Sequence, residues 1–526
     1  MKNKIIPVID LFAGPGGLAE GFSQYKDKNG WHVFRTLLSI EMEESAHMTL
    51  ALRSYVHKFI QSNRPIPEVY YDFIEKGKIL NKTDLITFLN QSKEGIEALN
   101  EAHRLTLGKD NQVIDDLIEE KLSTAETKEW VLIGGPPCQA YSIAGRVRNK
   151  TVSGYVPEND KRQYLYEEYL RIIAKFKPTV FVMENVKGLL SASLKGKSVF
   201  KKIIQDLELP EYAIDPCIQG GIRYRLFSLS KEIDSDSKPQ DYIVKSEFFG
   251  IPQKRHRVII LGVREDIQKT PATLKSRKQV NVSHVLQDLI PLVSRISRKG
   301  LAEGSKNSFS ISNIVSSLPT LSYSDLPLKS NITEKDFNLI RNEIHAIGGG
   351  DERNIPRKVN DGKSSFLKSW YHDFKLKGPL NHIPRSHMLG DLHRYLYASC
   401  FAKITQRSPS INEFPICLLP NHKNIKKNGQ TKNFTDRFKV QLATTPSSTI
   451  TSHIAKDGHY YIHFDPTQCR SLTVREAARL QTFPDNYFFC GNTTQQYHQV
   501  GNAVPPYLAY QVAGVIYDTI IADLDK

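Results

Sequence analysis

The chain of 526 residues has little cysteine and no long apolar run. Its six cysteines are scattered, and no CxxC pair or Cys/His cluster has zinc-ligand spacing, so we expect reduced thiols and no metal. No apolar stretch approaches the roughly 18–20 residues that a membrane helix needs. Asp10 also interrupts the N-terminus before a secretory signal could form. These absences predict a soluble cytoplasmic protein.

Glycine and proline, at 31 and 27 residues, are too few for a collagen-like or low-complexity chain, and no internal repeat is visible. By contrast, 40% of the residues are hydrophobic and 24% are charged, which is enough to bury a sizeable core. The length suits two or three domains.

Positive charge is in surplus, with 71 Lys and Arg against 56 Asp and Glu, giving a net charge of +15. Residues 265–469 hold 29 basic and 17 acidic side chains, so +12 of this surplus lies in about two-fifths of the chain. A localised basic surplus favours a polyanionic partner, nucleic acid before an anionic membrane face. A soluble protein that is merely basic fits the charge equally well.

The first 265 residues read as alternating strands and helices. Short runs rich in Val and Ile are typical of strands buried on both faces of a parallel sheet. Residues 164–176 have apolar positions at helical spacing. This pattern predicts an α/β, doubly wound, mostly parallel sheet. The expected strands are residues 5–12, 34–40, 130–133, 179–183 and 258–263.

Composition and hydrophobic periodicity divide the chain into three regions. Residues 1–268 form the expected α/β domain, with a charged helical insertion at about 43–129. Residues 269–440 are rich in Ser, Asn, Lys and Pro and predict a smaller, irregular domain with loops at 348–365 and 421–433. Residues 441–526, with expected helices at 473–481 and 505–521, complete the first domain.

The segment DLFAGPGGLAEG begins at Asp10 and leads from a buried strand through a glycine-rich turn into a helix. Glycines allow close backbone approach to a ligand, and the helix start adds oriented N–H groups. Pro15 and the adjacent glycines depart from the dinucleotide GxGxxG pattern. Glu41 ends the next strand, where a carboxylate can accept hydrogen bonds from ribose hydroxyls. The pattern favours a nucleoside cofactor, with a purely structural turn as the alternative.

Two further strands end in reactive side chains. The turn GGPPCQ presents Cys138 at the carboxyl edge of the expected sheet, where doubly wound folds bind ligands. A cysteine in general packs in the core, but the two prolines restrict this one, and a thiolate at such an edge is a candidate nucleophile. Glu184 ends the next strand and could donate a proton from a closed apolar cleft, or serve only as a capping or loop acid.

The segment QKRHR places Arg255 and Arg257 on one face of an extended segment that enters a buried strand. Burying a guanidinium is costly without an anionic partner, so these residues suggest a phosphate or base contact, or else a structural ion pair. The C-terminal segments REAARLQTFP and QVGNAVPP carry no function that spacing alone reveals.

Together these segments resemble the DNA (cytosine-5)-methyltransferase family of prokaryotic restriction–modification and related defence systems. DLFAGPGG, GGPPCQ, ENV, QKRHR, REAARLQTFP and QVGNAVPP occur in the family's order and cover both ends of the chain. The resemblance implies a Rossmann-like, class I S-adenosylmethionine-dependent methyltransferase fold. It also implies that the basic middle region is the target-recognition domain.

The resemblance further implies a mechanism on a cytosine flipped out of duplex DNA. Cys138 would add to C6, Glu184 would protonate N3, and Arg257 would hold O2. Arg255 would help to order the site and Asn185 would orient the backbone near Glu184. C5 would then take the methyl group, and water would remove the C5 proton. Residues 142–162 look like the mobile loop that closes over DNA in this family, with an exposed polar loop as the alternative.

A cofactor site is implied by the same resemblance. Phe12 and Met42 would pack the adenine of S-adenosylmethionine, and Glu41 would bind the ribose. An acid after the third strand would read the adenine amino group; Asp116 fits by its spacing to Cys138, and Asp84 is the rival. The full implied set is Phe12, Ala13, Gly14, Gly16, Gly17, Leu18, Glu41, Met42, Asp116, Pro136, Asn502 and Ala503.

The expected partner is double-stranded DNA with a specific cytosine-containing site, bound by a monomer that works beside a cognate restriction nuclease or defence complex. One alternative is a tRNA cytosine-5 methyltransferase, although that branch of the family lacks a large recognition domain. A second is a catalytically inactive DNA-binding regulator, which would be expected to lose Cys138, Glu184 or the glycine turn. A nicotinamide oxidoreductase would leave GGPPCQ and QKRHR unexplained.

Overall fold

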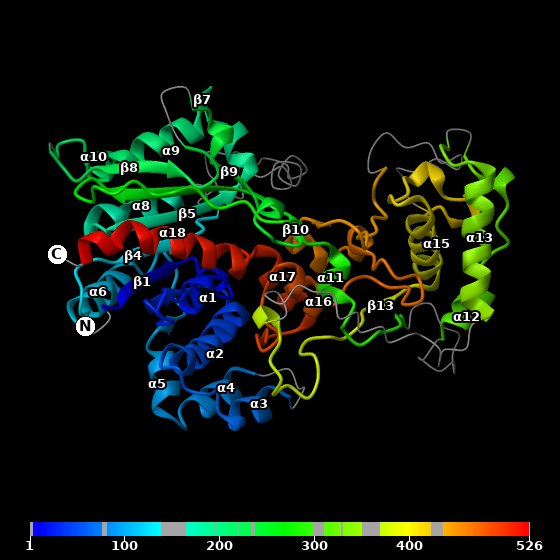
Figure 1. Cartoon of the computed structure of the whole chain (residues 1–526), viewed down its shortest axis with the longest axis horizontal. Helices are drawn as coiled ribbons and strands as arrows, with labels where there is room; N and C mark the ends of the chain where they lie inside the picture. The colour runs from blue at the N-terminus through cyan, green and yellow to red at the C-terminus, as the bar shows by residue number, and fades with distance from the viewer. Residues whose placement is uncertain are drawn as a thin grey trace.

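The computed structural model places the described residues in a large lobe around a central sheet and a smaller helical lobe beside it (Figure 1). Cys138, the predicted loop at 142–162, and most of the predicted loops at 348–365 and 421–433 lie outside the described residues. The structure describes residues 4–75, 81–137, 165–194, 196–218, 220–232, 237–297, 310–327, 330–349, 369–421 and 435–524.

The central sheet has eight strands and is mainly parallel, as the sequence predicts. Seven of them follow one another in the order β3-β2-β1-β4-β5-β11-β8, and β9 also pairs with β11. The first five run parallel, whereas β11 is antiparallel to its three partners β5, β8 and β9. The strands are β1 (Ile6–Leu11), β2 (Phe34–Ile40), β3 (Ala102–His103), β4 (Val131–Gly134), β5 (Val180–Val186), β8 (Tyr224–Ser228), β9 (Ile243–Lys245) and β11 (His256–Arg264).

Helices cover both faces of the sheet, because alternate strand residues point to opposite sides. Ile6 and Val8 of β1 pack in a core shared with α1 and α18, whereas Ile9 and Leu11 of the same strand pack in the core beneath α6, α8 and α9. Each such aliphatic side chain stabilises the fold by about 1.5–3 kcal/mol when fully buried. The helices are α1 (Gly17–Gln24), α6 (Asn111–Ser123), α8 (Leu165–Phe176), α9 (Val199–Glu208) and α18 (Pro506–Leu524).

The segment 43–129, expected as one helical insertion, is partly a regular portion of the α/β fold. It contains α2 (Glu44–Gln61) and β3, whose Ala102 pairs with Ser39 of β2. The additional part consists of three short helices that pack against α2 through an apolar core of their own. These helices are α3 (Glu68–Glu75), α4 (Lys82–Leu89) and α5 (Lys93–Leu99).

The smaller lobe was expected to be irregular, but its described part is organised around three packed helices. They are α12 (Ile311–Ser316), α13 (Glu334–Gly349) and α15 (Leu389–Thr405). The prediction missed α13 although Phe337, Ile340 and Ile344 are buried at helical spacing. Long polar segments on either side of this helix obscured the pattern.

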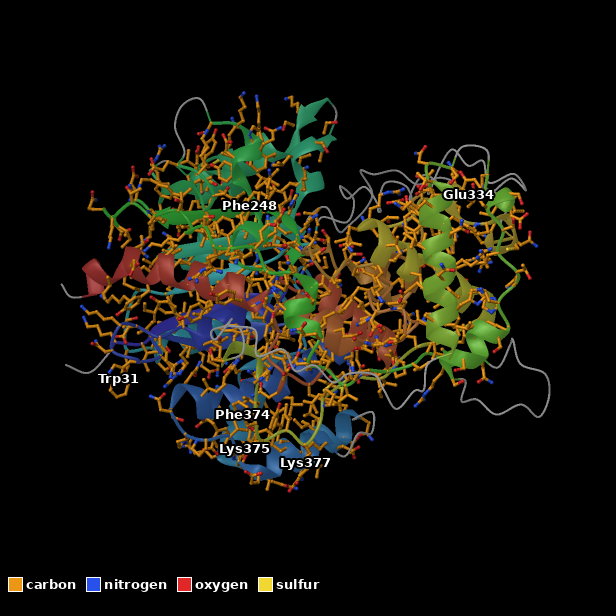
Figure 2. All side chains as sticks on the ribbon, turned by 45° about the vertical axis from the view of Figure 1, so that its right-hand side comes forward. Trp31, Phe248, Glu334, Phe374, Lys375 and Lys377 are labelled. Carbon is orange, nitrogen blue, oxygen red and sulfur yellow. The ribbon has the colours of Figure 1, made fainter. Side chains whose placement is uncertain are left out.

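The packing divides the chain less simply than the predicted boundaries at 268 and 440. Helix α11 (Val282–Leu286) packs against α16 (Val474–Leu480) of the C-terminal region, and Ile462 and Cys469 belong to the core of the smaller lobe. Residues 371–381, which we call the strap, lie against the large lobe and precede α15 of the smaller one in the chain. Figure 2 shows Phe374, Lys375 and Lys377 of the strap beside the blue helices from the N-terminal part of the chain.

The strap is bound to α3 by polar contacts. Tyr71 Oη donates to Asp373 Oδ2 at 2.7 Å, and the backbone N–H of Lys377 donates to Glu75 Oε1 at 2.7 Å. Helix α3 therefore serves as a docking surface for the strap. Within the described ranges, every helix is too short or too polar to cross a bilayer.

Candidate active site

Strand register brings the predicted site residues to one edge of the sheet. Leu11 of β1 lies opposite Ile40 and Gly134, and Gly134 lies opposite Met183 of β5. Because these strands are parallel, the residues that follow them gather at their common carboxyl edge. Arg257 of the antiparallel β11 pairs with Val186 and so reaches the same edge. The resemblance implies a cofactor around Glu41 and a cytosine around Glu184, and we therefore call these two sides of the edge the cofactor half and the cytosine half.

The cofactor half is built from the glycine-rich turn and Glu41. Phe12, Gly14 and Gly16 have φ angles of 56°, 57° and 93°, a left-handed path that favours glycine and turns the chain sharply into α1. The backbone N–H of Gly14 donates to Glu41 Oε2 at 2.8 Å, and that of Glu43 donates to Glu41 Oε1 at 2.7 Å. Burial raises the pKa of Glu41, and these amide donors oppose the rise.

The C-terminal segment lies against the start of α1. A Cβ at Gly17 would lie 2.3 Å from the carbonyl oxygen of Val504 and 3.3 Å from Ala503 Cβ, so no larger residue fits there. Ala503 therefore borders the glycine turn, and its predicted role in closing the cofactor site stays a prediction. A Cβ at Gly14 would meet nothing within 4 Å, so the turn faces open space at that point.

The cytosine half centres on Glu184, which is buried near the end of β5. Its Oε1 lies 2.9 Å from Nε of Arg257 and accepts no well-aligned hydrogen bond from the described residues. A Cβ at Gly135 would lie 3.4 Å from Glu184 Oε2. The carboxylate thus faces a guanidinium and the turn that precedes Cys138, rather than the apolar cleft that the sequence suggested.

Asn185 and Arg255 hold backbone segments around this pair. Asn185 Nδ2 donates to the carbonyl oxygen of Pro136 at 3.1 Å, which ties the turn after β4 to β5. Arg255 is fully buried and donates to the carbonyl oxygens of Ile450 at 2.8 Å and Gly501 at 3.2 Å. Burial, reinforced by the nearby charge of Arg257, lowers the pKa of Arg255 to about 9. Its contacts hold two segments of the C-terminal region together, and its role in ordering the active site stays a prediction.

A model of the C-5 cytosine-specific DNA methylase family matches residues 82–518. The chain belongs to this family. Its motifs at Glu184 and Arg257 lie within the matched range, whereas the glycine turn precedes it.

Similar proteins extend over nearly the whole chain. The type II methyltransferase M.Bpa9945I of Bacillus paralicheniformis is 32% identical over 526 residues, covering 98% of this chain and 99% of its own. The DNA (cytosine-5-)-methyltransferase M.ApeKI of Aeropyrum pernix is 27% identical and covers 74% of this chain and 82% of its own. A crystal structure of a prophage-encoded E. coli protein has a TM-score of 0.50 at 17% identity, covering 98% and 99% of the two chains. That likeness supports the fold alone.

The structure does not bring every predicted cofactor residue of this cytosine-5 methylase to the site. Asp116 is exposed in the middle of α6 and accepts a hydrogen bond from Gln112 at 2.7 Å, and Asp84 lies in the first turn of α4. Strand β3 ends at His103, so neither acid follows it directly. A strand of two residues is too short to recognise in the sequence, so the spacing to Cys138 did not locate the end of β3. The adenine-reading role of Asp116 stays a prediction without support from this placement.

The remaining predicted residues lie near the cofactor half. Met42 is exposed directly after Glu41, and Asn502 is exposed at the end of α17 (Thr493–Asn502). Leu18 packs its side chain into the core under α18, so only its backbone borders the turn. Ala13 donates its backbone N–H to the carbonyl oxygen of Ile40 at 3.0 Å, which joins the turn to β2.

Sequence reasoning missed Asp10, which lies in β1 directly before the glycine turn. Its side chain is fully buried, and neither carboxyl oxygen accepts a well-aligned hydrogen bond from the described residues. Burial, reinforced by the charge of Glu41, raises the pKa of Asp10 well above its usual range. The signal was present in the sequence, because an acid inside an otherwise apolar strand needs an explanation.

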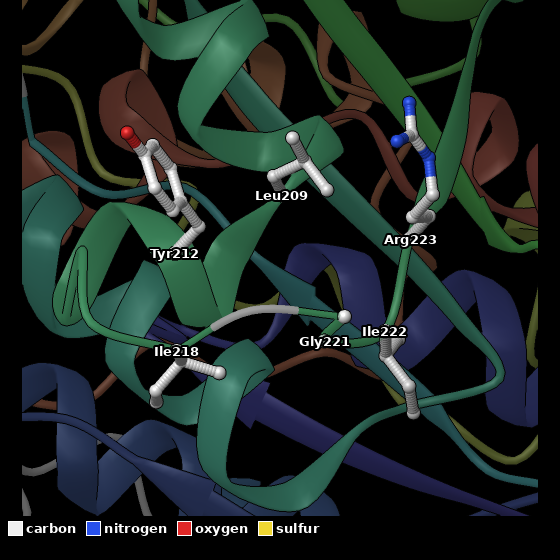
Figure 3. Close-up of a pocket in the computed structure, with 7 residues that line it drawn as sticks. Leu209, Tyr212, Ile218, Gly221, Ile222 and Arg223 are labelled. Atoms are coloured by element: carbon white, nitrogen blue, oxygen red, sulfur yellow. The ribbon is translucent and has the colours of Figure 1, made fainter.

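A cavity of about 280 Å³ lies elsewhere, beside α10 (Pro210–Ile214) (Figure 3). None of the predicted site residues that the structure describes lines it. Tyr224, at the start of β8 next to this cavity, pairs with Arg264 at the opposite end of β11 from Arg257. The cavity is therefore separate from the methylase site. Its lining is formed by Leu209, Tyr212, Ile218, Gly220, Gly221, Ile222 and Arg223.

Proposed function

We propose that this cytosine-5 methylase transfers a methyl group from S-adenosylmethionine to C5 of a flipped cytosine through a covalent Cys138 adduct. The observation that carries the proposal is the Glu184–Arg257 pair beside Gly135 and Pro136, the turn that leads directly to Cys138. This pair shares a sheet edge with Glu41 and the glycine turn. The same edge of the sheet thus offers Glu184 and Arg257 to bind a pyrimidine, and it offers the carboxylate of Glu41 to bind a ribose.

The reaction begins with a cytosine outside the stack, because its C6 is out of reach inside the duplex. The Cys138 thiolate forms a bond to C6 as the C5–C6 double bond breaks, and Glu184 gives its proton to N3. The negative charge that the ring would otherwise develop is thereby avoided. Arg257 holds O2 and keeps the ring in the plane of the carboxyl group.

When bound, S-adenosylmethionine would supply the methyl group for C5; the bond from its sulfur to the methyl group would break, and S-adenosylhomocysteine would leave. Water removes the C5 proton, the Cys138 sulfur leaves C6 as the double bond re-forms, and the N3 proton returns to Glu184. The carboxyl group is thus restored after each turnover, and the sulfur is free to attack again.

The residues of the cofactor half fit this donor. Glu41 keeps lone pairs beyond those used by the two amides, and a carboxylate so placed can accept hydrogen bonds from both ribose hydroxyls. The turn at Gly14 faces open space and offers close backbone approach. Proline and glycine in the turn, rather than GxGxxG, favour a methionine-bearing nucleoside over a dinucleotide.

Duplex DNA is the substrate that the family implies, and the basic surplus of residues 265–469 supports phosphate contacts by the smaller lobe. The type II relatives support protection of host DNA in a restriction–modification system with a cognate nuclease. We propose a monomer that acts in the cytoplasm. DNA affinity is expected to fall steeply with salt, and the slope is expected to shrink when basic residues of this region are neutralised.

DNA with 5-fluorocytosine at the target tests the covalent step, because fluorine cannot leave C5 as a proton does and the adduct persists. The wild-type protein should form a denaturant-stable complex in the presence of S-adenosylmethionine, and Cys138→Ser should form none. Cys217→Ser is the matched control, since Cys217 is a free, exposed cysteine that is not among the predicted site residues. A trapped complex with Cys138→Ser, or none with a wild-type enzyme that methylates ordinary DNA, would refute attack by Cys138. Methylation of tRNA but not of DNA would favour the tRNA alternative.

A further inference from the structure

The glycine turn is held from behind by Tyr487, a residue of the C-terminal region. The Tyr487 side chain is fully buried, and its hydroxyl donates to the carbonyl oxygen of Pro15. Pro15 lies between Gly14 and Gly16, the two glycines with left-handed backbone. A Cβ at Gly16 would lie 3.1 Å from Tyr487 Oη, so the tyrosine closes the space behind the turn.

A buried ionic cluster fixes the ring of Tyr487. The guanidinium of Arg53 lies 4.8 Å from the ring centroid and binds Glu20 of α1 through two hydrogen bonds of 2.6 and 2.7 Å. His57 Nε2 lies 2.7 Å from the same carboxylate. Burial alone would raise the pKa of Glu20, but the charge of Arg53 overcomes this effect and lowers it well below its usual range. The ion pair between Glu20 and Arg53 therefore holds Arg53 in place over the ring.

The neighbouring Asn486 connects this cluster to the strap. Asn486 Oδ1 accepts from Arg53 Nη1 at 2.9 Å, and Asn486 Nδ2 donates to Asp373 Oδ2 at 2.8 Å. The same oxygen of Asp373 accepts from Tyr71 of α3. The consecutive residues Asn486 and Tyr487 thus connect the glycine turn, α2, α3 and the strap.

We propose that Tyr487 is a positioning residue for S-adenosylmethionine, acting through Pro15 without touching the ligand. Gly14 is held on one side by Glu41, and Pro15 is held on the other by Tyr487. With both anchors in place, the backbone N–H groups of the turn keep the orientation that the methyl donor requires. The inference rests on the proposed use of S-adenosylmethionine.

Tyr487→Phe tests this role, because it removes the hydroxyl and keeps the ring under Arg53. The dissociation constant for S-adenosylmethionine, measured by calorimetry, should rise by about tenfold, the size expected for one buried hydrogen bond. The dissociation constant for a DNA duplex should stay at the wild-type value, because the glycine turn belongs to the cofactor half of the site.

Tyr497→Phe is the matched control. Tyr497 is also fully buried in the C-terminal region, and its hydroxyl donates to the carbonyl oxygen of Leu472 at 2.6 Å, away from the glycine turn. Both variants lose one buried hydrogen bond and should melt at a lower temperature, but only Tyr487→Phe should bind S-adenosylmethionine more weakly. Equal affinity in the Tyr487→Phe and wild-type proteins, or equal losses in both variants, would overturn the role of Tyr487. A wild-type protein that binds no S-adenosylmethionine would instead refute the proposed function.

Discussion

The two halves of the sheet edge each present one glutamate but hold it by different means. In the cofactor half, Glu41 accepts from the backbone N–H groups of Gly14 and Glu43. In the cytosine half, Glu184 pairs with the side chain of Arg257, which reaches it from the antiparallel strand β11. The first arrangement depends on backbone groups, one of them in the glycine turn 27 residues away. The second depends on a side chain 73 residues away.

This difference indicates how each half should respond to change. Amide donors are neutral and are fixed by the turn, so they orient Glu41 without adding a full charge. A guanidinium brings a permanent charge and a planar set of donors, which can bind a carboxylate and a pyrimidine oxygen together. We therefore expect substitutions in the cytosine half to lower the rate, and those in the cofactor half to lower the affinity for S-adenosylmethionine.

The largest effect should come from Glu184→Gln. An amide cannot give N3 a proton and regain it, so kcat should fall by about 10²–10⁴-fold, the usual contribution of general acid–base catalysis. Single-turnover methylation measures the rate, and calorimetry should give an unchanged dissociation constant for S-adenosylmethionine. If the affinity for S-adenosylmethionine fell as much as the rate, the two halves of the site would not act independently.

Arg257→Lys should lower kcat/KM by about 10–100-fold, because an ammonium group cannot bind both Glu184 and the cytosine oxygen in the geometry of the planar guanidinium. Arg264→Lys is the matched control on the same strand. Arg264 pairs with Asp266 and Glu129 at the far end of β11, so the rate should stay near the wild-type value. Equal losses in both variants would point to a general effect on β11 instead.

Glu41→Gln should weaken S-adenosylmethionine binding by about tenfold or more, since a charged acceptor contributes about 1.5–3 kcal/mol. Burial raises the pKa of Glu41. Binding needs the ionised form, so affinity should hold above this raised pKa and fall as the pH drops through it. Calorimetry from neutral to mildly acidic pH should show this fall in the wild type and not in Glu41→Gln; an identical pH dependence would assign the effect to another group.

The smallest effect should come from Lys375→Ala in the strap. Lys375 pairs with Glu68 at 2.6 Å, but both side chains are largely exposed, and such pairs contribute at most about 1 kcal/mol. Thermal unfolding should change little, and neither the rate nor the cofactor affinity should move. A marked loss of rate would show that the strap acts on the site more directly than its surface contacts suggest.

The sequence predicted the sheet well because its strands are buried on both faces. Residues 34–40 are found as β2 without change, and the run 258–263 lies within β11. The antiparallel direction of β11 could not be predicted, because a run of buried Val and Ile looks the same in either direction. The placement of Glu41 and Glu184 at one edge could be predicted for the same reason, since parallel strands of this fold end at a common edge.

Other features depend on contacts between distant segments. Tyr487 behind Pro15 is separated from it by 472 residues, and no local pattern reveals that contact. The sequence also left the partner of Glu184 undecided, because Arg257 could bind a phosphate, a base or an acid. The structure shows that Arg257 forms an ion pair with Glu184. The packing of the strap against the added helices could be learned only from the structure, because the two segments are far apart in the sequence.

Transfer of labelled methyl groups tests the central claim most directly. Purified protein, duplex DNA and tritiated S-adenosylmethionine should yield labelled DNA, and digestion to nucleosides should place the label in 5-methyldeoxycytidine. Label in a methylated adenine, in cytosine carrying the methyl group on its exocyclic nitrogen, or in tRNA alone would contradict the assignment of the site.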